Sequence, residues 1–88
     1  METNPIHYGL SIHTQLVELD DNRLGIRRVI KSRIIRKDAL KIVEIANQIR
    51  NDLPDLKLTL ICTRNICSKS VALLESKGVE ILFVDLAL

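Results

Sequence analysis

Residues 24–53 read LGIRRVIKSRII followed by RKDALKIVEIANQIRNDL, and the spacing of their apolar residues changes at Arg36. Before Arg36, apolar and basic residues alternate, which is typical of a strand with one buried face. After Arg36, apolar residues recur at helical spacing as far as Leu53, and Pro54 follows directly. The stretch therefore predicts a strand over residues 24–35 that leads into a helix over residues 36–53.

The residues before this stretch predict a second strand that pairs with the first. Apolar and polar residues alternate from Tyr8 to Leu19, and residues 20–23 (Asp-Asp-Asn-Arg) have the composition of a turn. We therefore expect a β-hairpin with one apolar and one basic side. The basic side carries Arg27, Lys31 and Arg33. Residues 1–7 show no pattern and are expected to form a loose N-terminal arm.

The residues after the long helix predict three further elements. Residues 57–62 (KLTLIC) form a short apolar strand suited to the interior of a sheet. Ser68 or Ser70 is expected to cap a helix that runs to Lys77 and ends at Gly78, and residues 79–84 form a last strand. The order is β-β-α-β-α-β, with a right-handed parallel crossover at the end. The predicted fold class is α/β, a small mixed sheet with helices packed on it.

The length and composition indicate a single domain over residues 1–88 with a thin aliphatic core. The chain has 88 residues, with one Phe, one Tyr and no Trp. A chain of this size buries only about 60–65% of its unfolded surface. Since small domains gain stability from additional burial, and residues 81–88 are strongly apolar, we expect a homodimer.

The two cysteines and the chain start favour a reducing, cytoplasmic compartment. Cys62 and Cys67 do not form a disulfide framework, and the first residues lack the basic and apolar regions of a signal peptide. No apolar run approaches ~18 residues, so no membrane span is expected. A C-x4-C pair without a nearby His is a poor zinc signal. The sequence predicts no cofactor and no metal.

The net charge of +2 hides an uneven distribution. Residues 23–50 contain nine basic residues against Asp38 and Glu44, a net charge of +7, and the other residues carry −5. Such a concentration of positive charge indicates a polyanionic partner. The candidate phosphate contacts are Arg27, Lys31, Arg33, Arg36, Lys37 and Lys41, with His13 and Arg64 as accessory candidates.

The element order resembles the core of the restriction-endonuclease-like nucleases, with a pattern nearest to the Mrr-type and archaeal Holliday-junction-resolvase group. Residues 28–33 (RVIKSR) stand where that family has its (Glu/Gln)-x-Lys strand, and residues 38–42 resemble the start of the following helix. The later strand, helix and strand are matched by residues 60–63, Ile66, Ser68 and residues 78–82. The resemblance covers about residues 9–86 and implies a nuclease that holds Mg²⁺ with an Asp and a Glu.

The chain departs from the family at these charged positions. Lys31 takes the Glu/Gln position and Arg33 the Lys position, while a turn near Asp21 would bring His13 to about the place of the metal-binding Asp. A hard cation such as Mg²⁺ needs oxygen ligands, and a His-Lys-Arg cluster repels it. We therefore expect no catalytic residues, and a non-catalytic accessory or regulatory protein that binds nucleic-acid backbone.

Other uses of the basic residues stay open. They could form a solvated strand face that blocks aggregation, or pair with acidic residues of a partner. The alternative function is then an assembly module without a nucleic-acid role. A residual nuclease is a third, including a metal-free ribonuclease with His13 as the base. Stacking on bases is disfavoured because the aromatic residues are Tyr8 and Phe83 alone.

Overall fold

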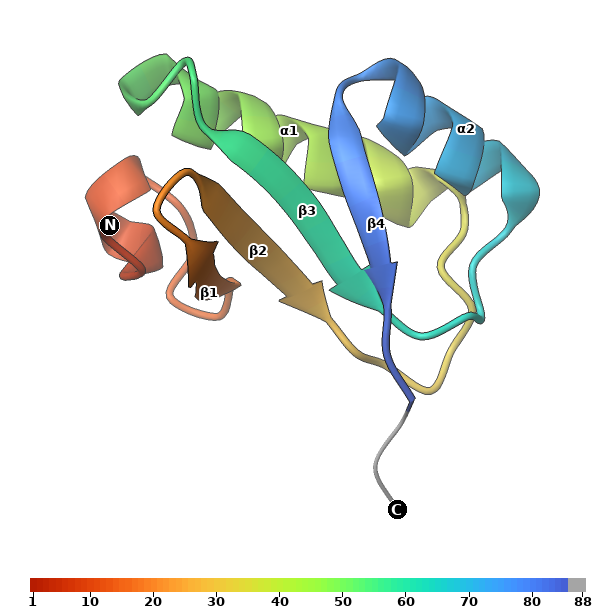
Figure 1. Cartoon of the computed structure of the whole chain (residues 1–88). Helices are drawn as coiled ribbons and strands as arrows, with labels where there is room; N and C mark the ends of the chain where they lie inside the picture. Colours follow the sequence, from red (N-terminus) through yellow and green to blue (C-terminus); the bar gives the residue numbers. More distant parts are fainter. Residues whose placement is uncertain (86–88) are drawn as a thin grey trace.

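A computed structural model describes residues 1–85, which form a four-stranded sheet with two helices on one of its faces (Figure 1). The strands lie in the order β1-β2-β3-β4. β1 pairs antiparallel with β2, while β2–β3 and β3–β4 are parallel. The elements are a 3-10 helix Pro5–Tyr8, β1 Gln15–Asp20, β2 Arg23–Arg28, α1 Arg36–Asp52, β3 Lys57–Cys62, α2 Ser68–Ser76 and β4 Val79–Phe83. This confirms the predicted mixed α/β sheet and its element order.

The core lies between the sheet and the two helices. Leu24 and Ile26 of β2 and Leu58 and Leu60 of β3 are 0–3% exposed and face the helices. The α1 side of the core is formed by the helical stripe Ala39, Ile42, Val43, Ala46 and Ile49. Burial of each Ile, Leu or Val side chain in this core contributes about 1.5–3 kcal/mol. The opposite face of the sheet carries no helix within residues 1–85 (Figure 1).

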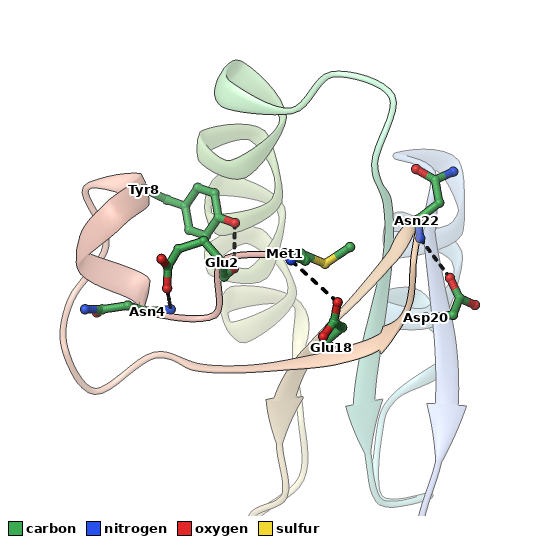
Figure 2. Close-up of polar contacts among 7 residues, drawn as sticks. All are labelled: Met1, Glu2, Asn4, Tyr8, Glu18, Asp20 and Asn22. Carbon is green, nitrogen blue, oxygen red and sulfur yellow. Dashed lines mark hydrogen bonds and ion pairs between the residues drawn. The ribbon is translucent and has the colours of Figure 1, made fainter.

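The first eight residues are ordered rather than a loose arm, which corrects the prediction. The Asn4 side chain accepts a hydrogen bond from the Ile6 N–H at 3.1 Å, and Gly9 closes the 3-10 helix with φ +75°. Tyr8 is buried, and its hydroxyl donates to the Glu2 carbonyl at 2.6 Å (Figure 2). The Met1 amino group also lies 3.6 Å from the Glu18 carboxylate. Burial of one aromatic ring thus anchors a segment whose sequence shows no period.

Both hairpin strands are shorter than predicted. β1 begins at Gln15 instead of Tyr8, and β2 ends at Arg28 instead of Ile35. The turn between them lies where expected, with the Asp20 side chain accepting from the Asn22 N–H at 3.0 Å (Figure 2). β2 and β3 end together, with Arg28 opposite Cys62 as the last pair. Residues 29–35 therefore form a loop that leads to α1.

The two helices and the last strand follow the predicted ranges closely. α1 ends one residue before the predicted Leu53, and β4 ends at Phe83. The N-terminal cap of α2 differs, since Cys67 holds the cap position in place of Ser68 or Ser70. In the part of the chain that the structure describes, neither helix is long and apolar enough to cross a membrane.

Candidate nucleic-acid interface

Two loops meet at the carboxyl end of the parallel strands. The β2–α1 loop and the β3–α2 loop are joined by hydrogen bonds from the Ile34 N–H to the Asn65 carbonyl (2.9 Å) and from the Cys67 N–H to the Ile34 carbonyl (3.0 Å). The Asn65 side chain also donates to the Lys31 carbonyl at 3.3 Å. Open α/β sheets commonly bind ligands at this end. The loops bring Lys31 and Arg33 to the same end of the sheet as Arg64.

A pocket of about 210 Å³ lies between the residues that lead into β1, the end of β2 and the first turns of α1. Its polar lining includes Arg27, Arg28 and Lys41, together with His13 and the acid Asp38. Arg27 donates to the Gln15 side chain at 2.9 Å, which orients the guanidinium along the hairpin. The pocket therefore combines a positive wall with an apolar floor of Ile26 and Ile42.

Arg28 is a pocket residue that the sequence reasoning did not select. Its guanidinium lies 3.8 Å from Asp38, whose other carboxylate oxygen accepts the Ile35 N–H at 3.1 Å. Asp38 therefore has two roles: it caps the helix and it pairs with Arg28. The signal was present in the alternation, because Arg28 falls on the apolar side of β2 with Leu24 and Ile26. A charge on that side at a strand end indicates a side chain directed into a pocket.

Together these residues form what we call the carboxyl-end cluster. Its members are Arg27, Arg28, Lys31, Arg33, Arg36, Lys37, Lys41 and Arg64. Asp38 and Asp85 are the acidic residues of this end within residues 1–85. Arg64 extends over the Phe83 ring at 5.2 Å, a cation–π contact that holds its guanidinium at the end of β4. The cluster contains all six predicted phosphate contacts.

The predicted arrangement of these residues is wrong in two respects. Lys31 and Arg33 were expected on the same strand face as Arg27, but they lie in the loop beyond β2. The pairing of β1 with β2 ends at Gln15 opposite Arg27, so His13 does not face Lys31 across the hairpin. The alignment of Lys31 and Arg33 with the family's (Glu/Gln)-x-Lys strand positions therefore does not hold. No group of three or more His, Cys, Asp or Glu residues that could hold a metal ion occurs among residues 1–85.

Cys67 lies at the edge of the cluster and differs from the other cysteine. Its sulfur is 2.8 Å from the Ser70 hydroxyl at the start of α2. Hydrogen bonds from Ser70, and more weakly the charge of Arg33, lower the pKa of the Cys67 thiol. Burial raises the pKa of the Cys62 thiol instead. The hydrogen bonds to Ser70 are thus the main cause of the lowered pKa of Cys67, and the charge of Arg33 makes a smaller contribution.

Comparison with known proteins supports the fold through structure alone. Neither protein-family models nor curated protein sequences give a match. A solved structure described as EndoMS in apo form superposes with a TM-score of 0.66, at 16% identity over 82% of this chain. This chain therefore shares the fold of the matched part of EndoMS. The present chain spans about a third (34%) of the EndoMS chain, and an identity of 16% shows a shared fold and nothing further.

Proposed function

We propose that this protein binds the phosphate backbone of nucleic acid through the carboxyl-end cluster and does not cleave it. The observation that carries the proposal is the grouping of eight cationic side chains at one end of the sheet, against Asp38 and Asp85. Neutralisation of several phosphates releases counterions and supplies most of the affinity of sequence-independent binding. An accessory or regulatory role, and the likeness to the Mrr-type group in particular, belong to this proposal.

The availability of these charges supports the proposal. Within residues 1–85, Arg28 is the one member of the cluster that has an acidic partner within 4 Å. Lys31, Arg33, Arg36 and Lys37 are exposed, and Arg64 is exposed as well. Exposed cations without acidic partners can contact phosphate without first breaking an ion pair. Contact with backbone rather than bases fits an interface whose one aromatic ring, Phe83, has the Arg64 guanidinium 5.2 Å from its centroid.

A mobility-shift assay at two salt concentrations tests the proposal with random duplex and single-stranded probes. We expect a complex at low salt that weakens steeply as salt rises. The Lys31→Glu/Arg33→Glu variant should weaken binding by at least tenfold, because it reverses two charges in the cluster. The matched control is Lys57→Glu/Lys77→Glu, which makes the same charge change at the amino end of the strands, and it should bind nearly as the parent does.

Each result decides between the functions that the sequence left open. Absence of a complex at low salt would overturn the binding proposal and favour an assembly module. Equal loss in the two double variants would mean that net charge, and not the cluster, attracts the probe. Incubation of the probes with Mg²⁺ tests the nuclease alternative, and cleavage that His13→Ala abolishes would overturn the non-catalytic part of the proposal.

A further inference from the structure

The two edges of the sheet differ in how they are protected against pairing with another strand. β1 has a bulge between Glu18 and Asp20, and the Met1 amino group lies against Glu18. Charged residues and bulges are the usual means of blocking an edge. β4 has the sequence Val-Glu-Ile-Leu-Phe over Val79–Phe83, with a regular register against β3 and no bulge. Of the two edges, β4 is therefore the one able to accept another strand.

The outward backbone groups of β4 can be assigned from its pairing with β3. The Val84 N–H donates to the Cys62 carbonyl at 2.8 Å and so points inward. Because the direction of backbone groups alternates along a strand, Glu80 and Leu82 also point inward. The N–H and C=O groups of Val79, Ile81 and Phe83 then face outward. Among residues 1–85, β4 has no strand other than β3 beside it.

We propose that β4 pairs antiparallel with β4 of a second copy of this chain, about a two-fold axis at Ile81. This register places Ile81 opposite Ile81, and Val79 opposite Phe83 of the partner subunit. All three are positions whose backbone groups face outward, so the pairing forms about six hydrogen bonds and uses every outward group of the strand. The two sheets join into one sheet of eight strands.

The charge pattern of β4 selects a second copy as the occupant. Glu80 is the one charged residue of the strand, and the two-fold axis places it opposite Leu82 of the partner subunit rather than opposite another carboxylate. Glu80 is also already neutralised, since its carboxylate lies 3.6 Å from the Arg23 guanidinium. Phe83 (38% exposed) and Leu82 (46% exposed) become less exposed to solvent in the same contact. The strand is thus complementary to itself in hydrogen bonding and in charge.

Pairing with β1 of another copy is the competing arrangement, and the structure disfavours it. The bulge at β1 breaks the regular spacing of outward groups that β4 would need. A β4–β1 contact would also leave one free edge on each copy and produce open chains, whereas β4–β4 pairing closes on itself. A five-residue strand forms a small interface, so we expect a reversible dimer whose population depends on concentration.

Sedimentation velocity from micromolar to millimolar protein tests the proposal on the complete chain. The parent protein should convert from monomer to dimer as concentration rises. Leu82→Glu places two carboxylates opposite each other at two symmetric positions, and the dissociation constant should rise roughly tenfold. Combining it with Glu80→Lys turns each of these contacts into an opposite-charge pair and should restore the dimer. The matched control is Val17→Glu, which introduces the same charge at a 37% exposed apolar residue of β1.

The outcomes separate this proposal from the nucleic-acid proposal because the assay contains no nucleic acid. A protein that stays monomeric throughout overturns the pairing. A dimer that Val17→Glu dissociates and Leu82→Glu does not would assign the contact to the β1 side instead. A dimer lost in Leu82→Glu and not recovered in the double variant would overturn the two-fold at Ile81. Circular dichroism and urea unfolding of each variant verify that the fold is kept.

Discussion

The amino and carboxyl ends of the parallel strands use basic residues in different ways. At the amino end, Arg23 lies 3.9 Å from Asp20 and 3.6 Å from Glu80. Arg50, in the last turn of α1, donates to the carbonyls of Lys77 and Gly78 at 2.8 and 2.7 Å. These two guanidinium groups connect β1, β4 and the end of α2 to the rest of the fold. Both guanidinium groups therefore make their contacts within the molecule.

At the carboxyl end most cations make no such contact. Within residues 1–85, the ion pair of Arg28 with Asp38 is the only one in the carboxyl-end cluster. Arg36 and Arg50 show the contrast most clearly, because they lie at opposite ends of the same helix. Arg50 satisfies two carbonyls, whereas the structure gives Arg36 neither an ion pair nor a side-chain hydrogen bond. Position in the fold, and not residue type, therefore decides whether a basic residue contributes to stability or remains available to a partner.

The largest effect on stability is expected from Arg50→Met, which keeps the aliphatic stem and removes both hydrogen bonds. Hydrogen bonds from charged groups contribute about 1.5–3 kcal/mol each when buried, and less in this exposed position. We expect the free energy of unfolding to fall by about 1–2 kcal/mol, measured by urea denaturation. Arg36→Met is the matched control and should change it by less than about 0.5 kcal/mol. Equal losses would remove the distinction between the two ends.

The order of the two variants should reverse when nucleic-acid binding is measured: Arg36→Met should have the larger effect and Arg50→Met the smaller. Arg36→Met should lower affinity several-fold and reduce the slope of log affinity against log salt by about one, as expected for the loss of one phosphate contact. Arg50→Met should leave the slope unchanged, provided that binding is measured where the variant stays folded. If Arg50→Met reduced the slope as much as Arg36→Met, the probe would be responding to overall charge and not to the carboxyl end.

The sequence was sufficient to predict the fold because its signals are local. The change of period at Arg36 and the stops at Pro54 and Gly78 depend on neighbouring residues, and they predict helix positions within a residue or two. The ends of the hairpin strands are not local. Ile34 continues the alternation of β2 and is 1% exposed, but it reaches the core from a loop. β2 ends at Arg28 opposite the last residue of β3, a strand far along the chain, and no local signal in the sequence marks that position.

The same reason explains what was predicted of the candidate site. The basic residues were identified from composition, and they were expected on one face of the hairpin and in the first turns of the following helix. Their predicted arrangement depended on the register of the hairpin. That register was wrong because β2 was assumed to continue to Ile35. Because β2 ends at Arg28, Lys31 lies in a loop and His13 does not lie opposite it. Arg28 was missed because alternation assigned it to the buried side.

The smallest predicted effect is a shift in the pH dependence of the Cys67 thiol, which responds to the Ser70 hydrogen bonds and, more weakly, to the charge of Arg33. Because the pKa of Cys67 is lowered, its thiolate forms at a lower pH in the folded than in the unfolded chain. The rate of alkylation by iodoacetamide should therefore reach its midpoint at a lower pH when the chain is folded. Cys62 is buried with a raised pKa and should stay unmodified until the chain unfolds.

Three substitutions separate the causes of this shift. Ser70→Ala removes the largest one and should move the midpoint furthest upward, while Arg33→Gln should move it less, because a charge acts weakly through solvent. Lys69→Gln is the control, since it also removes one positive charge near the start of α2 but keeps the Lys69 backbone group whose hydrogen bond helps to lower the pKa of Cys67. A midpoint that Lys69→Gln moves as far as Arg33→Gln would mean that the thiol senses the general positive charge. A response to Arg33 alone would instead place the Arg33 guanidinium beside the loop that carries Cys67, as the carboxyl-end cluster requires.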